Sequence, residues 1–217
     1  EDVDTALRIR DRLVGEPDGP RALYLCHGFC EIGAQPLVPV LRGIRDFLVE
    51  NPGEVLVIVF EDYVAPEEVA QAFEESGLLR LVYRGPVERP WPTLRQLIAK
   101  DERVIVFAEK NAAGVPWYHQ AFEVIQETPY HFEAPEELSC AVNRGGTEGS
   151  LFQINHWIDT TPTPKPSNAR IVNAREFLLD RARRCREERG MLPNILAVDF
   201  VLTGDVFGAA AELNGLN

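Results

Sequence analysis

The sequence lacks several features that would assign it at once to a class of protein. The net charge is −12, which argues against the basic surface of a nucleic-acid-binding protein. The same acidity would repel an anionic membrane surface. No apolar run approaches the ~18 residues of a spanning helix, and no signal peptide is visible. The 217 residues suit one domain with a sizeable core.

What the sequence does contain is a series of short apolar runs alternating with helical patterns. Almost unbroken apolar runs are typical of strands that are buried on both faces. Six strands are predicted, at residues 22–26, 54–60, 103–108, 121–127, 150–157 and 194–201. Helices are predicted at residues 36–51, 66–75, 93–100, 173–190 and 204–215. This alternation favours a parallel sheet with right-handed crossovers.

Polar residues collect where the predicted strands end, at His27, Glu61–Asp62, Glu109–Lys110, Glu127, Asn155–His156 and Asp199. No glycine-rich phosphate loop of the type GxGxxG follows a strand, which argues against a nucleotide-binding sheet. In a (β/α)8 barrel the carboxyl ends of all strands converge on one mouth, where such residues would do chemistry. Six strands alone cannot close that ring.

The stretch "YLCHGFCEIG" places His27 between Cys26 and Cys30. A structural zinc site would need a second pair of ligands at finger-like spacing, which is missing. A nucleophilic cysteine would need a base partner, and His27 lies in a tight loop before Gly28. A proton-transferring histidine is the third reading, because an imidazole holds or releases a proton near neutral pH.

The motifs "LCHGFCEIGAQPLVPVLRGIRDFLVENPGEVLVIVFEDYV", "QETPYHF", "CAVNRGG", "FQINHW", "VNAREFLLDRARRC" and "LPNILAVDF" occur in this order. The sequence thereby resembles the phosphatidylinositol-specific phospholipase C X-domain family of PLC-like phosphodiesterases, and especially its secreted or membrane-tethered bacterial and plant branch. The resemblance covers nearly the whole chain. It implies a single TIM-like (β/α) barrel domain over residues 1–217 that is incomplete, with six of eight strands and the first two expected upstream of Glu1. The family's first catalytic histidine would lie there too.

The resemblance also implies roles for particular residues. His27 matches the family's second catalytic histidine, which donates a proton to the departing glycerol oxygen as general acid. Asp199 matches the aspartate that orients the first catalytic histidine, a role that carboxylates play toward imidazoles in catalytic triads. Without the resemblance, His27 would be a hydrogen-bonding residue at a strand end, and Asp199 a carboxylate needing a partner in an apolar strand.

Two further residues match positions that bind metal or substrate in the family, and two more are candidates from their place at a strand end. Glu61 matches a calcium ligand of some members, and its carboxylate suits a hard cation such as Ca²⁺. Lys110 matches lysines that contact phosphate or inositol and would stabilise the phosphoryl charge. Asn155 and Trp157 end a strand where an aromatic ring could stack on inositol. Solvated side chains at strand ends are the alternative for Glu61 and Lys110, and "NRGG" at 143–146 is predicted to be a turn.

The number of cysteines is even, and the branch that the chain resembles is exported. We therefore expect disulfides between Cys26 and Cys30 and between Cys140 and Cys185. The protein is expected to be extracytoplasmic, and three Lys against nineteen Arg is a bias typical of bacterial genomes rich in GC.

The predicted function is that of a phosphoric diester hydrolase that cleaves an inositol phospholipid or a related phosphodiester by general acid and base catalysis. Calcium is the one cofactor suggested, and a phospholipid or small phosphodiester is the expected partner. This fragment alone is expected to be weakly active. A glycerophosphodiester phosphodiesterase and a catalytically silent domain that binds lipid headgroups are the two alternatives.

Overall fold

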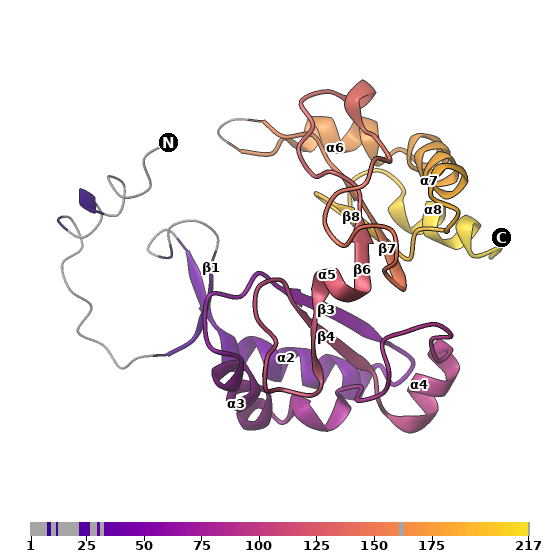
Figure 1. Cartoon of the computed structure of the whole chain (residues 1–217). Helices are drawn as coiled ribbons and strands as arrows, with labels where there is room; N and C mark the ends of the chain where they lie inside the picture. The colour runs from indigo at the N-terminus through magenta and orange to yellow at the C-terminus, as the bar shows by residue number, and fades with distance from the viewer. Residues whose placement is uncertain are drawn as a thin grey trace.

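Figure 1 shows the computed structural model of the chain, which describes residues 8–9, 12, 22–26, 30, 33–160 and 163–216. The strands are β1 (Tyr24–Cys26), β2 (Ala34–Pro36), β3 (Leu56–Phe60), β4 (Val104–Ala108), β5 (Tyr118–Gln120), β6 (Ile125–Glu127), β7 (Leu151–His156) and β8 (Ile195–Val198). The α-helices are α2 (Leu37–Glu50), α3 (Pro66–Ser76), α4 (Leu94–Lys100), α5 (Ala121–Val124), α6 (Pro166–Val172), α7 (Arg175–Arg189) and α8 (Val206–Leu213). Two 3₁₀ helices are η1 (Leu78–Leu81) and η2 (Pro135–Glu137). Within the described ranges, no helix has the length and apolar character needed to cross a membrane.

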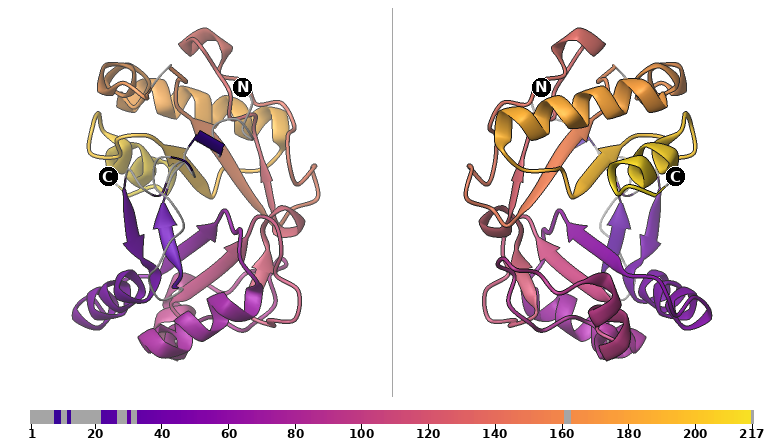
Figure 2. Two further views of the ribbon diagram at one scale, coloured as in Figure 1. Left: turned by 90° about the vertical axis from the view of Figure 1, so that its left-hand side faces the viewer. Right: turned by 90° about the vertical axis from the view of Figure 1, so that its right-hand side faces the viewer.

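The strands form three small sheets. One parallel sheet has the order β3-β4-β5 and a second has the order β6-β7-β8, while β1 and β2 form an antiparallel pair. The two parallel sheets lie between two groups of helices, with α2 and α4 on one side and α7 on the other (Figure 2). Helices therefore cover the outer face of each sheet, as in α/β folds.

The expected TIM-like barrel is not present, and this prediction was wrong. Over the described residues the strands form separate sheets of two and three strands, with no closed ring. A barrel needs an unbroken ladder of paired strands around its circumference. Here β5 and β6, three residues each, are separated by the helical turn Ala121–Val124, and β1 pairs with β2 instead of β3. The result is an α/β arrangement of two facing parallel sheets.

Side chains alternate along the strands between the face that packs against helices and the face that points toward the other sheet. The first kind forms two outer cores and the second kind forms one inner core. The even-numbered residues of β3, Leu56 to Phe60, pack with α2 and α3, while Phe152 and Ile154 of β7 pack with α7 and α8. The opposite faces meet between the sheets. This inner core includes Ile105, Phe107, Ile125, Leu151 and Ile195. The inner face of β3 is left open, because Val57 and Val59 are 45% and 40% exposed.

Local sequence signals explain where several elements begin and end. Thr93 accepts a hydrogen bond from the backbone N of Gln96, and the Gln96 side chain reciprocates, so a capping box starts α4. Gly77 and Gly190 adopt left-handed conformations that end α3 and α7. The predicted helices at 66–75, 93–100, 173–190 and 204–215 all appear, with their ends shifted by up to two residues.

Both expected disulfides are present. Cys26 is joined to Cys30 across four residues, with their Cα atoms 5.1 Å apart, and Cys140 is joined to Cys185 across 45 residues, with a Cα separation of 5.0 Å. In the chain-entropy model, a closed loop of the second size stabilises the folded state by about 4 kcal/mol. This bond ties the segment before β7 to helix α7.

Candidate active site

The candidate site lies at the carboxyl ends of the parallel strands. In the register of β3 and β4, Phe60 pairs with Ala108, so Glu61 and Glu109 follow at the same level on adjacent strands. Glu109 lies two residues after the inner-core residue Phe107 and therefore on the same face of the sheet. Glu127 ends β6 opposite Gln153 of β7. The resulting strand-end cluster consists of Glu109, Glu127, Asn143, Arg144, Gln153 and Asn155.

Glu127 is the hub of this cluster. Its side chain is fully buried, and its Oε1 accepts hydrogen bonds from Arg144 Nε at 2.5 Å and from Asn143 Nδ2 at 2.9 Å. Its Oε2 accepts from Asn155 Nδ2 at 3.0 Å and from Arg144 Nη2 at 3.2 Å. Gln153 Nε2 adds a longer hydrogen bond to Oε2 at 3.5 Å. Both oxygens are therefore fully satisfied. Glu127 therefore holds its neighbours in place.

Arg144 bridges two carboxylates and is held between two aromatic rings. Its Nη1 donates to Glu109 Oε2 at 3.0 Å while its other nitrogens bind Glu127. The guanidinium carbon lies 4.0 Å from the ring centroid of Phe122 and 4.8 Å from that of Tyr130. Burial lowers the pKa of Arg144, but the bonds and charges of Glu127 and Glu109 outweigh burial and leave that pKa raised. Its side chain remains 37% exposed, so a fixed cation faces the solvent side of the cluster.

The "NRGG" segment places Arg144 at this position. Asn143 N donates to Glu127 O and Glu127 N donates to Arg144 O, each at 3.1 Å. Gly145 has a φ of +75°, and a Cβ at this position would lie 2.0 Å from the carbonyl oxygen of Ile125. Glycine is therefore required for the loop to lie against β6. The sequence pattern predicted the turn but not its function, although an arginine beside two glycines was the available signal.

Glu61 and Lys110 are brought together through Tyr63. Tyr63 Oη donates to Glu61 Oε1 at 2.5 Å, and Lys110 Nζ lies 3.7 Å from the centroid of the Tyr63 ring. Asp62, which is 6% exposed, fixes the loop after β4 by accepting from the backbone N of Lys110 and of Asn111 at 2.9 Å each. A second group of charged side chains thus lies at the ends of β3 and β4.

Comparison with known protein families identifies this arrangement. The model of the family described as PI-PLC X 1 matches residues 14–214. The chain belongs to the PI-PLC X domain family. No solved structure gives a match. The strand ends described above are therefore those of a PI-PLC X domain.

Three proteins are similar in sequence to this PI-PLC X chain. An "Uncharacterized secreted protein" of the fungus Arthroderma benhamiae is 28% identical over 89% of this chain and 50% of its own length. A PI-PLC X domain-containing protein of Arabidopsis thaliana is 26% identical over 96% of this chain and 52% of its own length. PI-PLC X domain-containing protein 1 of Arthroderma benhamiae is 26% identical over 88% of this chain and 69% of its own length. The chain spans about half the length of the first two. These relatives are fungal and plant proteins, so they do not support the expected bacterial source.

The structure places the other predicted site residues of this PI-PLC X chain as follows. His27 lies outside the described residues. Asp199 follows β8, and its backbone oxygen accepts from Asn173 Nδ2 at 2.8 Å. Burial, followed by the charge of Asp159, raises the pKa of the Asp199 carboxyl group. Among the described side chains none donates a hydrogen bond to this carboxylate.

Asn155 and Trp157, predicted to bind substrate, are both engaged within the protein. Asn155 is 1% exposed, and its Nδ2 donates to Glu127 and to Thr128 O, while its Oδ1 accepts from Gln153. Trp157 Nε1 donates to Asp159 Oδ1 at 3.2 Å. Asn155 thus belongs to the strand-end cluster, whereas Trp157 and Asp199 line the same small hollow.

The described residues do not fit a calcium site. Calcium takes six to eight oxygen ligands, yet no group of three or more acidic, histidine or cysteine side chains gathers to hold a metal within the described ranges. The Glu61 carboxylate also accepts a hydrogen bond from Tyr63. The calcium expectation stays a prediction, and no step proposed below passes through a metal.

His156 is a buried neutral imidazole, and this gives a testable pH dependence. Its Nε2 lies 2.7 Å from Val172 O and its Nδ1 accepts from Arg181 Nη1 at 2.9 Å. Burial, together with the Arg181 charge, lowers the pKa of His156 to about 4. In the unfolded chain the pKa of His156 is ~6.5. Between pH 6.5 and 4 the unfolded state therefore binds more protons at this residue than the folded state does. The stabilisation is therefore complete above pH 6.5 and is lost as the pH falls toward 4.

We expect the free energy of unfolding to fall by about 2 kcal/mol from this residue between pH 7.5 and 5. Urea titrations at both pH values would measure it. A His156→Gln variant, which cannot take up a proton, should show a correspondingly smaller decrease. An equal decrease in both proteins would contradict the assignment of a neutral His156.

Proposed function

We propose that the chain is the catalytic X domain of a phosphoric diester hydrolase that cleaves an inositol phospholipid. The observation that carries this proposal is the paired Arg144 and Glu109 at the strand ends. Three of the five guanidinium N–H groups are used by Glu127 and Glu109, which leaves two donors. Glu109 Oε1 receives no hydrogen bond among the described residues. A hydroxyl group can accept from the guanidinium and donate to the carboxylate, and neighbouring hydroxyls on one ring can do both.

Charge complementarity favours a polyol ring over a bare anion at this position. Arg144 is flanked by Glu109 and Glu127 at hydrogen-bond distance, so its positive charge is already compensated. An isolated phosphate here would meet two carboxylates, and like charges at short distance are unfavourable. The phosphodiester is better placed toward Lys110, whose ammonium group lies at the neighbouring strand end. Inositol at Arg144 and phosphate near Lys110 is the arrangement that we infer.

In the proposed reaction a hydroxyl of the inositol ring gives its proton to a general base, the role of the family's first catalytic histidine, and attacks its own phosphodiester. A P–O bond to the ring oxygen forms as the P–O bond to glycerol breaks. His27, in the role carried over from the family, donates the proton to the departing glycerol oxygen. Lys110 stabilises the phosphoryl charge, and Asp199 orients an imidazole in the site. Asn155 is assigned to holding Glu127, because its amide group is already satisfied within the protein.

Two exposed apolar side chains beside the strand ends support a lipid substrate. Tyr63 follows β3 and is 76% exposed, and Leu202 follows β8 and is 87% exposed. We propose that these side chains contact the surface of the membrane that presents the headgroup. Burying one leucine in an apolar environment is worth about 1.5–3 kcal/mol.

Leu202→Asp should therefore lower turnover of phosphatidylinositol in vesicles by about 10-fold or more. Turnover of water-soluble glycerophosphoinositol should stay near the wild-type value, because that substrate needs no membrane contact. Rates on both substrates, measured with equal enzyme, make the comparison. An equal loss on both would place Leu202 in the fold or the site rather than at a lipid surface.

The two disulfides and a relative named as a secreted protein support an extracytoplasmic location, because disulfides persist in oxidising compartments. A substrate panel separates this function from its alternatives. We expect soluble inositol phosphate to be released from phosphatidylinositol vesicles, with little cleavage of glycerophosphocholine. Preferred cleavage of glycerophosphocholine would favour a glycerophosphodiester phosphodiesterase. Binding of the vesicles with no cleavage would favour a silent headgroup-binding domain.

A further inference from the structure

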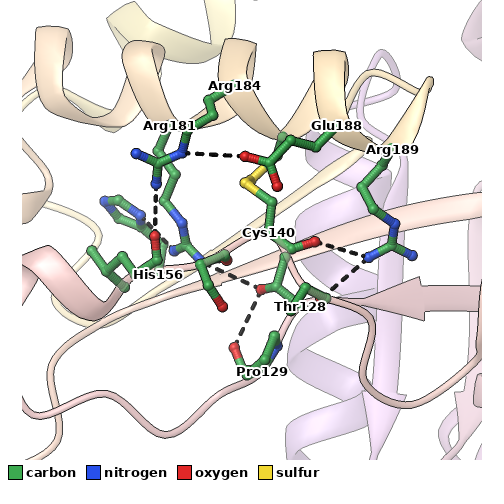
Figure 3. The surroundings of a disulfide bond; sticks show 12 residues. Thr128, Pro129, Cys140, His156, Arg181, Arg184, Glu188 and Arg189 are labelled. Carbon is green, nitrogen blue, oxygen red and sulfur yellow. Dashed lines mark hydrogen bonds and ion pairs between the residues drawn. A yellow bond between two sulfur atoms is a disulfide. The ribbon is translucent and has the colours of Figure 1, made fainter.

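Helix α7 is attached to the segment before β7 by a row of arginines and a disulfide (Figure 3). Arg184 Nη2 donates to Leu138 O at 2.6 Å, and Arg181 Nη2 donates to Ser139 O at 2.8 Å. Cys185, from the same helix, is bonded to Cys140. This segment leads directly into the loop that carries Arg144. The position of α7 is thereby coupled to that of the loop.

Arg189, the last residue of α7, contacts both ends of this loop. Its Nη1 donates to Cys140 O at 3.2 Å and to Ala141 O at 3.3 Å, and its Nη2 donates to Gly146 O at 2.9 Å. The same Nη2 donates to Gln126 Oε1 at 2.6 Å, which anchors the guanidinium to β6. The Arg189 side chain thus binds the loop 141–146 at both of its ends, and Arg144 lies between these two contacts.

The loop is fixed by side-chain and backbone contacts, to β6 and to Arg189, and not by regular secondary structure. Apart from an isolated bridge between Asn143 and Gly145, residues 141–146 form no helix or strand. Arg144 must nevertheless meet Glu127 and Glu109 at hydrogen-bond distance. A displacement of about 1 Å in a group that positions substrate can reduce turnover substantially. The contacts of Arg189 with the loop therefore affect the position of the Arg144 side chain.

We propose that Arg189 is a positioning residue that acts through Arg144. It fixes the loop so that the guanidinium group of Arg144 faces the substrate headgroup. This role rests on the proposed function. It requires an arginine, because the planar fork spans carbonyls on both sides of the loop and the Gln126 amide at once. A lysine offers three donors at one point on a flexible stem. Lysine at position 189 should hold one end of the loop and release the other.

Amide hydrogen exchange of the whole chain tests the grip without any substrate. The matched pair is Arg189→Gln and Arg186→Gln, because both remove a cation from the last turn of α7 and Arg186 is exposed. We expect exchange in residues 141–146 to be about 10-fold faster in Arg189→Gln than in Arg186→Gln. Exchange at the interior α7 residues Leu178 and Leu179 should be alike in both. Equal rates across 141–146, or a uniform increase over the whole chain, would overturn the proposal.

Turnover of phosphatidylinositol vesicles provides the functional readout. In Arg189→Gln, kcat/KM should fall by about 10-fold, mainly through a higher KM, because ring hydroxyls are held in the bound substrate as well as in the transition state. Arg186→Gln should match the wild type, and Arg189→Lys should lie between. A fall in kcat at constant KM would overturn the positioning role. If the wild type cleaves no phosphodiester, the proposed function fails, and hydrogen exchange still decides whether Arg189 holds the loop.

If Arg189→Gln does not fold, Arg189→Lys and Arg186→Lys carry the exchange comparison, since both keep the positive charge. Faster exchange of residues 141–146 in Arg189→Lys than in Arg186→Lys supports the claim that only a planar guanidinium binds both ends of the loop. Equal exchange in the two lysine variants overturns it.

Discussion

In the intact protein, replacing His27 by alanine should lower kcat for phosphatidylinositol by about 10²–10⁴-fold and leave KM nearly unchanged. A general acid acts on the leaving oxygen only as the bond breaks, so its removal lowers kcat and kcat/KM together. The loss corresponds to roughly 3–5 kcal/mol of barrier. Steady-state kinetics on the purified variant measures both constants. His131→Ala is a suitable control, because His131 is exposed and paired with Asp159.

A second substrate separates proton donation from binding. An analogue whose leaving group is much more acidic needs little protonation, so it should recover a large part of the lost rate in His27→Ala. If that analogue is affected as strongly as the natural diester, or if KM rises at constant kcat, His27 is a binding or structural residue and the general-acid role is wrong.

The second large effect is expected on stability, from the buried pair at the centre of the cluster. Arg144→Met should lower the free energy of unfolding by about 3 kcal/mol, because it leaves the fully buried Glu127 carboxylate without its cation. This is the lower end of the range for buried pairs, since Arg144 is itself partly exposed. Glu127→Gln should give a loss of similar size. Turnover should fall in both variants.

A double-mutant cycle in urea isolates the coupling. The variant carrying both Arg144→Met and Glu127→Gln should lose clearly less than the sum of the two single losses, because neither partner is then left alone. Arg183→Met is a matched control, since its ion pair with Glu212 lies at the surface and should matter little. Additive losses in the cycle would show that Arg144 and Glu127 do not stabilise each other.

The sequence was most informative where its signals are local. Unbroken apolar runs predicted β3, β4, β7 and β8, and the helices predicted at 93–100 and 173–190 correspond to α4 and α7. Residues 121–127 were predicted to be one strand, whereas the structure has the helical turn α5 followed by the short strand β6. Short apolar stretches do not distinguish a buried strand from a buried helical turn. That turn also interrupts the ladder that the expected barrel required.

The candidate site was predicted in part for a related reason. Strand ends indicated Glu61, Glu109 and Glu127, because residues after parallel strands share one edge. Arg144 comes from a loop outside any strand and joins the cluster through a backbone approach that requires Gly145. Such contacts join segments far apart in the sequence, and no residue pattern near Arg144 encodes its partners. The role of Asn155 as a support for Glu127 became visible for the same reason only in the structure.

The most direct test of the central claim is ³¹P NMR of phosphatidylinositol vesicles incubated with the intact protein, because residues 1–217 alone are expected to be weakly active. The account predicts that the diester signal of the lipid disappears while a soluble inositol phosphate signal grows and diacylglycerol remains in the vesicles. Phosphate that stays with the lipid as phosphatidic acid, or a diester signal that persists while glycerophosphocholine is consumed, would contradict it.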